Sequence, residues 1–116
     1  MKMRAERNDL NEKEINMYLL HGKLKAKDGY KSELANILLE ASKHVAKAKG
    51  CKLYVIGNDE SDKNAIYVTE IWDSKEDHDN SLKAEGVSEL IKNAMPIIDG
   101  QPQKGQELQI LGGVGI

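Results

Sequence analysis

Three residues that could perform acid–base chemistry or bind an aromatic ligand lie close together between residues 67 and 82, in the stretch YVTEIWDSKEDHDNSL. Glu70 has apolar neighbours, and a carboxylate that faces a dry cavity has a raised pKa and can act as a base. His78 carries an imidazole, which can also act as a base at neutral pH. Trp72 is the only tryptophan and could stack on a planar substrate. We therefore treat Glu70 and His78 as candidate catalytic residues and Trp72 as a candidate substrate-binding residue.

Each of these residues also has a purely structural interpretation. Trp72 could belong to a core or to a subunit interface, because large aromatic side chains are common in both. Glu70 could be exposed or paired with a lysine, since structural ion pairs also perturb carboxylates. His78 could be a partly buried histidine that makes only a structural hydrogen bond. The sequence leaves these alternatives open.

Further candidates for substrate binding lie in other predicted strands. His21 shares a strand face with Leu19 and could contact a ligand or satisfy a structural hydrogen bond. Hydroxyl groups that could donate to a bound ligand are those of Tyr18, Tyr54 and Tyr67. The three histidines form no i, i+4 pair and have no cysteine beside them, so the sequence predicts no metal site.

Four strands are predicted from apolar alternation and from the turn residues that bound them. They cover residues 16–26, 51–56, 65–72 and 107–111. The polar stretch GNDESDKN at 57–64 joins the second strand to the third. So short a polar connection predicts an antiparallel hairpin.

Two helical regions are predicted between these strands. In the first, which begins at residue 30, apolar residues recur at steps of three and four, and Gly50 is a typical C-terminal cap. The second begins with Asp73 or Ser74 as its N-cap, is interrupted at Gly86, and ends at the proline at 96. Beyond the interruption, its apolar stripe consists of Val87, Leu90, Ile91 and Ala94.

The order β-α-β-β-α-β predicts an α+β protein of the ferredoxin-like type, with an antiparallel sheet and both helices on one sheet face. Alternation in the third strand places Val68, Glu70 and Trp72 on one face and Tyr67, Thr69 and Ile71 on the other. Neither face is uniformly polar, although helices cover only one. We therefore expect the second face to be buried against another copy of the chain, in a homodimer.

Length and composition narrow the protein classes. The 116 residues predict one domain, and the net charge of -2 gives no reason to expect binding to nucleic acid or to an anionic membrane. No apolar stretch is as long as a membrane span, and no apolar segment typical of a signal peptide lies at the start. The one cysteine, Cys51, is expected to be a buried, unreactive thiol. These features favour the cytoplasm. Residues 1–15 are mostly polar and are predicted to form an N-terminal extension or arm of a domain at 16–116.

Three stretches resemble the antibiotic biosynthesis monooxygenase family and, within it, the bacterial quinol monooxygenase branch. They are GCKLYVI after the first helix, YVTEIWDSKEDHDNSL, and the closing LGGVGI. The resemblance covers residues 16–116, and its most specific part is Glu-x-Trp-x-Ser followed by the helical His. It implies a ferredoxin-like dimer in which two sheets face each other as an α+β barrel, in agreement with the pattern.

The activity that this resemblance implies is oxidation of a small phenolic or quinol-type substrate by O₂, without metal, flavin or haem. Such a site must bind the ring, remove a proton and exclude water. Gly22, Ser81 and Ile91 stand where haem-degrading relatives carry Asn, Trp and His, which argues against haem degradation. We therefore expect a cofactor-independent monooxygenase. The alternative is a dimeric α+β barrel that only binds a small ligand or has a structural role.

Overall fold

The computed structural model describes residues 17–101 and 105–116. Its elements are β1 (Tyr18–Lys25), α2 (Lys31–Val45), β2 (Cys51–Asn58), β3 (Ala65–Trp72), α3 (Lys75–Ser81), α4 (Glu85–Ala94), the 3-10 helix η2 (Met95–Ile97) and β4 (Gln106–Gln109). The predicted ferredoxin-like α+β order is confirmed, with the second helical region divided into α3 and α4. The arm predicted for residues 1–15 lies outside the described residues.

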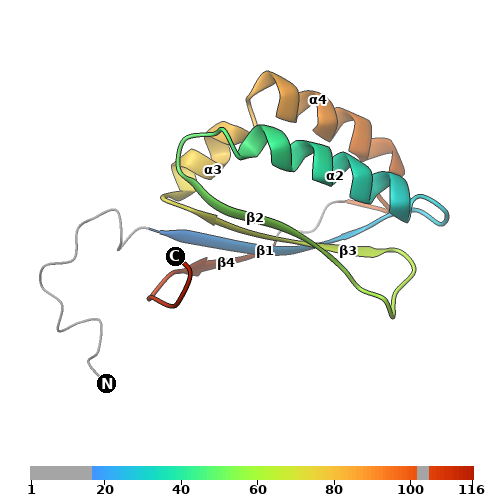
Figure 1. The fold of residues 1–116 in the computed structure, drawn as a ribbon. Coiled ribbons are helices and arrows are strands. Elements are labelled where there is room, and N and C mark those ends of the chain that lie inside the picture. The colour runs from blue at the N-terminus through green and yellow to red at the C-terminus, as the bar shows by residue number, and fades with distance from the viewer. Residues whose placement is uncertain (1–16, 102–104) are drawn as a thin grey trace, which may run out of the picture.

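The four strands form an antiparallel sheet in the order β2-β3-β1-β4, so β1 and β3 occupy its centre. The polar connection between β2 and β3 makes the predicted hairpin, and the three helices lie together over one sheet face (Figure 1). Glu70 in β3 stands opposite Leu20 in β1 and Tyr54 in β2. These three side chains therefore share the face that the helices cover.

Helix α2 ends earlier than the sequence predicts. It stops at Val45 rather than at Gly50, because the chain then tightens into turns in which the Ala48 N–H donates to the Val45 carbonyl, three residues back. Gly50 is still required by the backbone, since its φ is 84° and it leads into β2. Within 17–101 and 105–116, no helix combines the length and apolar character needed to cross a membrane.

The break between α3 and α4 also differs from the prediction. It lies at residues 82–84, and Gly86 falls inside the first turn of α4 rather than at the interruption. There the ring of His44 packs so closely that a Cβ at position 86 would lie 2.6 Å from its Nδ1 atom. The start of α3 agrees with the sequence, because the Ser74 hydroxyl caps it by accepting a hydrogen bond of 3.1 Å from the Asp77 N–H.

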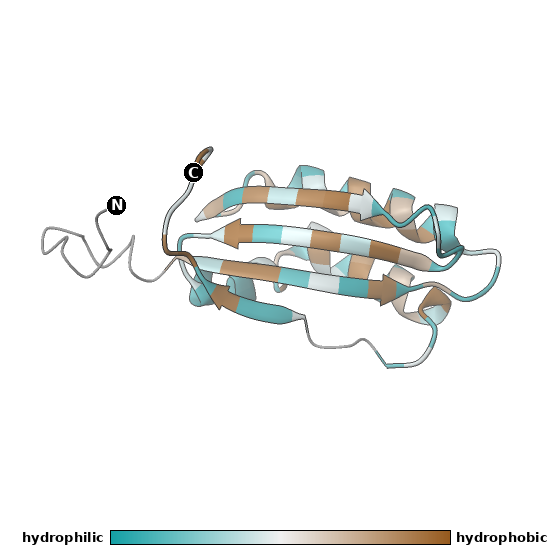
Figure 2. Cartoon of the chain, turned by 90° about the horizontal axis from the view of Figure 1, so that it is seen from below, coloured by the Kyte–Doolittle hydropathy of each residue, from teal (hydrophilic) through white to brown (hydrophobic). Residues whose placement is uncertain are grey.

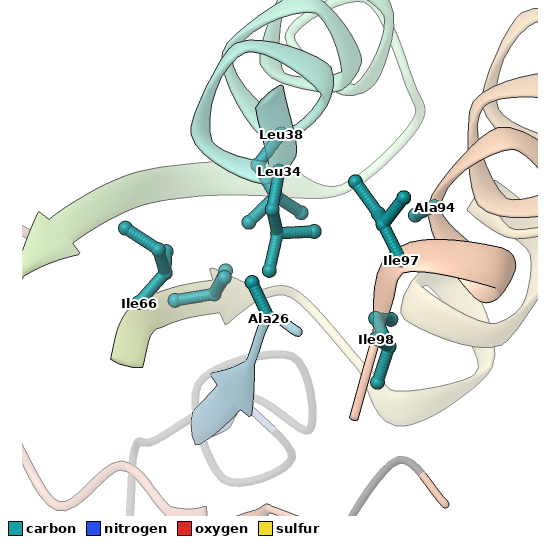
Figure 3. Packing of buried hydrophobic residues seen from close by; sticks show 8 residues of the cluster. Ala26, Leu34, Leu38, Ile66, Ala94, Ile97 and Ile98 are labelled. Carbon is teal, nitrogen blue, oxygen red and sulfur yellow. The ribbon is translucent and has the colours of Figure 1, made fainter. Parts of the chain in front are cut away.

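Two apolar clusters hold the helices on the sheet. The first centres on Leu34 of α2, which is fully buried, and is drawn in Figure 3. Its buried members are Ala26, Leu34, Leu38, Ile66, Val68, Ala94, Ile97 and Ile98. The second cluster is built from Tyr18, Val45, Trp72 and Val87. Because removal of apolar surface from water is the main stabilising effect in folding, these two clusters fix the distance between helices and sheet.

The opposite face of the sheet carries no helix in the described part of the chain (Figures 1 and 2). This face carries both polar and apolar side chains, and large aliphatic side chains remain exposed on it: Val55 in β2 and Leu108 in β4 are each 50% exposed. We call this the outer face, defined by Leu19, Leu53, Val55, Ile71 and Leu108. The sequence-based expectation of a sheet with two partly apolar faces therefore agrees with the structure.

Trp72→Ala should lower the free energy of unfolding by about 3–5 kcal/mol, because the indole is completely buried in the second cluster and alanine would leave a large cavity. Urea denaturation followed by circular dichroism would measure the change. Leu39→Ala, on the exposed side of α2, is the control and should cost less than about 1 kcal/mol. Equal losses for the two variants would contradict the assigned role of Trp72 in the core.

Candidate active site

A cavity of about 340 Å³ lies between the sheet and helices α2 and α4. Most of its wall is aliphatic: it is lined by Leu20, Leu24, Ile37, Leu38, Ala41, Val45, Tyr54, Glu70, Ser81, Leu82, Val87, Leu90, Ile91, Ala94, Met95 and Ile98. Leu82, Ile91 and Met95 remain partly exposed and mark its opening to solvent. The volume falls within the usual range for sites that hold a small molecule.

Among the described residues that line this cavity, Glu70 is the one with a charged side chain. It lies in the middle of β3, its alternation with Thr69 and Ile71 turns it toward the helices, and the residue is only 9% exposed. Its Oε1 atom accepts a hydrogen bond of 2.9 Å from the Trp72 indole N–H. This bond offsets part of the cost of placing a carboxylate in an apolar setting.

Burial controls the protonation of Glu70. The loss of water around the carboxylate raises the pKa of Glu70, while the hydrogen bond from Trp72 and the charge of His78 oppose the shift to a smaller extent. Burial also raises the pKa of the neighbouring Tyr54 hydroxyl and Cys51 thiol, and the negative charge of Glu70 adds to both effects. Of these three groups, the Glu70 carboxyl has the lowest ordinary pKa, and burial moves that pKa upward, in the direction of neutral pH.

His78 lies behind Glu70, on the first turns of α3. Its imidazole packs against the rings of Tyr18 and Trp72, with centroid distances of 5.5 and 5.8 Å. The Nε2 atom is 3.8 Å from Glu70 Oε1, and the Nδ1 atom is 2.9 Å from the Asp79 Oδ1 atom. The imidazole is thus placed between a buried carboxylate and a surface carboxylate.

The structure brings Glu70, Trp72 and His78 together but gives them different positions relative to the cavity. Glu70 and Tyr54 line it, whereas Trp72 and His78 are not among the lining residues. Trp72 is fully buried and contacts the site through its hydrogen bond to Glu70. His78 reaches the cavity in the same indirect way, through the carboxylate.

The other two candidates, His21 and Tyr67, lie on the outer face of the sheet. Their rings stack with centroids 5.6 Å apart, and His21 Nδ1 is 3.0 Å from the Thr69 hydroxyl oxygen. The sheet itself separates them from the cavity. Alternation already placed Tyr67 on the face opposite to Glu70, so the sequence contained the signal for this separation.

Several residues of the site were not among the candidates from the sequence. Leu20 and Ser81 line the cavity, and Asp79 contacts His78 from the surface. The pairing of Leu20 with Glu70 follows from the strand register, which alternation alone does not fix. Among residues 17–101 and 105–116, no group of His, Cys, Asp and Glu side chains is arranged to hold a metal ion.

Glu70→Gln should change how stability depends on pH. The pKa of Glu70 is raised in the folded state, so between about pH 4.3 and that higher value the folded protein binds more protons than the unfolded chain. Parent stability should therefore fall as pH rises through this window, whereas the glutamine side chain of the variant does not titrate. Urea denaturation should show that the free energy of unfolding of the variant, relative to that of the parent, rises with pH through this window and is constant above it.

The control for this experiment is Glu60→Gln, which removes a carboxylate from the exposed β2–β3 turn. Its stability relative to the parent should change less with pH than that of Glu70→Gln. A difference between Glu70→Gln and the parent that is the same at every pH would contradict the burial effect assigned to Glu70.

Comparison with known proteins agrees with this geometry. The family model for antibiotic biosynthesis monooxygenases matches residues 17–93. A solved structure from Chloroflexus aurantiacus J-10-fl, a provisional antibiotic biosynthesis monooxygenase, is 37% identical, with a TM-score of 0.78 over 87% of this chain and 99% of that one. No curated protein matches the sequence.

More distant structures share the fold. A provisional antibiotic biosynthesis monooxygenase from Nitrosomonas europaea is 12% identical, with a TM-score of 0.76 over 83% of this chain and 91% of that one. A conserved protein from Methanosarcina mazei Go1 is 14% identical, with a TM-score of 0.75 over 86% of this chain and 98% of that one. The match of the family model over most of the described residues and the 37% identical structure agree with each other. The chain therefore belongs to the antibiotic biosynthesis monooxygenase family.

Proposed function

We propose that this protein is a cofactor-independent monooxygenase that oxidises a small phenolic or quinol-type substrate with O₂. The observation that carries the proposal is the buried carboxylate of Glu70 in the wall of a largely aliphatic cavity of about 340 Å³. A base in a water-poor site can remove the proton of a bound hydroxyl group, and the resulting phenolate is electron-rich enough to react with O₂.

The cavity wall favours a neutral substrate. In the described part of the chain its lining includes Glu70 but no Lys or Arg, so a carboxylate or phosphate group would meet a negative charge without a compensating cation. A substrate hydroxyl, in contrast, can donate to Glu70 and can also receive a hydrogen bond from the Tyr54 hydroxyl. The aliphatic side chains of α2 and α4 would enclose the ring.

The proposed reaction begins with transfer of the hydroxyl proton from the substrate to the Glu70 carboxylate. The ring carbon of the phenolate then forms a bond to O₂ and gives a hydroperoxide. The O–O bond of the hydroperoxide then breaks. One oxygen leaves as water, which takes up the proton returned by Glu70 and the hydrogen from the ring carbon. The second oxygen remains on that carbon as a quinone carbonyl. One substrate and one O₂ thus yield one quinone and one water. The bond from Trp72 keeps the Glu70 carboxylate directed at the cavity.

We propose further that the protein acts as a homodimer that buries the outer face. Val55 and Leu108 are half exposed there, and large apolar side chains on an open sheet face are costly in water. His21 and Tyr67 lie on the same face, so in this dimer they would face the partner copy rather than the cavity described above.

The alternative function is that of a barrel that binds a small ligand without converting it. The aliphatic majority of the wall favours this interpretation, and a filled interior would have favoured a purely structural role. The presence of Glu70 in the wall favours the enzyme, because a buried carboxylate with a raised pKa is suited to take the proton of a bound hydroxyl group as well as to accept its hydrogen bond.

Glu70→Gln should reduce turnover by about 10²- to 10⁴-fold, the usual contribution of a positioned base, while binding of the quinol changes little. Oxygen consumption with a panel of quinols would measure this, with Glu60→Gln as the control expected to keep parent activity. A parent that binds a quinol but consumes no O₂ above the level of unfolded protein would support the alternative. Full activity of Glu70→Gln on a substrate that the parent oxidises would contradict the role of Glu70.

Val55→Lys should weaken or abolish the homodimer, because it places a charge on the outer face beside Thr69 of the central strand β3. Leu39→Lys is the matched control, since Leu39 is also 50% exposed but lies on α2, away from the sheet. Sedimentation velocity at several micromolar concentrations should show a dimer for the parent and for Leu39→Lys and a monomer for Val55→Lys. A parent that sediments as a monomer would contradict the dimer.

A further inference from the structure

Three side chains form a line from the cavity to the protein surface. Glu70 and His78 are each 11% exposed at the side chain, whereas Asp79 is 51% exposed. The Asp79 Oδ1 atom is 2.9 Å from His78 Nδ1, and His78 Nε2 is 3.8 Å from Glu70 Oε1. Each imidazole nitrogen thus faces a different carboxylate.

The contact with Asp79 determines which imidazole nitrogen carries the proton. An ionised carboxylate only accepts hydrogen bonds, so Nδ1 must be the donor in a bond of 2.9 Å. In a neutral imidazole, Nε2 then has a free lone pair, and this lone pair faces Glu70. Two acceptors oppose each other there unless a proton lies between them. The pair of Glu70 and His78 is therefore arranged to take up one proton.

The surrounding groups keep this arrangement in place. The rings of Tyr18 and Trp72 pack on the imidazole, and the Tyr18 hydroxyl donates to Glu107, which is paired with Lys75. The remaining titratable groups close to Glu70 are Cys51 and Tyr54, whose raised pKa values leave them neutral. A shift of Nε2 by roughly 1 Å toward Glu70 would turn the contact of 3.8 Å into a hydrogen bond.

We propose that Asp79 is a positioning residue that holds His78 with Nδ1 protonated, so that Nε2 can receive the proton that Glu70 takes from the substrate. This inference rests on the proposed function of Glu70. The proton passes from the substrate hydroxyl to the Glu70 carboxylate and then to Nε2, which gives an imidazolium between two carboxylates. It returns along the same path to the oxygen that leaves as water. Asp79 itself is not protonated, and these side chains exchange no electrons with the substrate.

The first test is the tautomer of His78, which nitrogen NMR of the imidazole ring reports directly at about pH 8, above the usual range of imidazole protonation. The parent should show Nδ1–H, with the resonance assigned by its loss in His78→Gln. In Asp79→Ala the acceptor for Nδ1 is absent and Glu70 is the carboxylate that remains, so the ratio of Nδ1–H to Nε2–H should fall by about tenfold or more. Glu76→Ala, also an exposed carboxylate of α3, should leave the ratio unchanged.

An Nε2–H tautomer in the parent, or an unchanged ratio in Asp79→Ala, would overturn the proposal.

The second test is kinetic: Asp79→Ala should lower kcat with little change in KM, and Glu76→Ala should change neither. Thermal unfolding of both variants would show whether they are folded, and the exposed position of Asp79 predicts that they are. If the tautomer responds as expected but the parent oxidises no quinol, the proposed function fails while the positioning of His78 by Asp79 is supported.

Discussion

A carboxylate buried on the helix side of a central strand is the constraint around which this fold is arranged. Glu70 occupies a position where the pattern of β3 calls for an apolar residue, next to Val68 and Trp72. The fold tolerates it because the fully buried Trp72 supplies an N–H to its Oε1 atom. The indole rings therefore pack in the core, and the indole N–H donates to the carboxylate. Both contacts are possible because Trp72 lies at the end of β3, where the chain turns into α3.

Much of this fold follows from local patterns in the sequence. The alternation of apolar residues predicts the strands and the faces of the sheet. The polar residues after β2 predict the hairpin, and Ser74 predicts the start of α3. The ends of helices were less predictable, because they depend on contacts between distant segments. The sequence pattern at Gly86 looks like an interruption, but Gly86 lies inside α4, where the ring of His44 on α2 packs closely against it.

The sequence indicated which side chains of the candidate site lie near one another, but not how they are arranged around the cavity. Glu70, Trp72 and His78 were found from their spacing, and the structure does place them in contact. Which of them faces the cavity depends on the helices above the sheet, and no local pattern reports where α4 closes over Glu70. The separation of His21 and Tyr67 from the cavity could have been inferred, since a strand places neighbouring residues on opposite faces. The contact between Asp79 and His78 could not, because it depends on side-chain rotamers.

The division of the second helical region into α3 and α4 has a consequence for how this protein can evolve. The aliphatic wall of the cavity comes mainly from α2 and α4, whereas His78 and Asp79 belong to α3, a helix of 7 residues between the Ser74 cap and the break at residues 82–84. Mutations in α4 can therefore reshape the space for a ligand without touching the imidazole. Mutations at His78 or Asp79 of α3 can alter the pairing of the imidazole with Glu70 and leave most of that wall unchanged, although Ser81 of the same helix lines the cavity. The wall that shapes the cavity and the imidazole beside Glu70 are thus inherited largely on separate segments, and selection can act on each of them in turn.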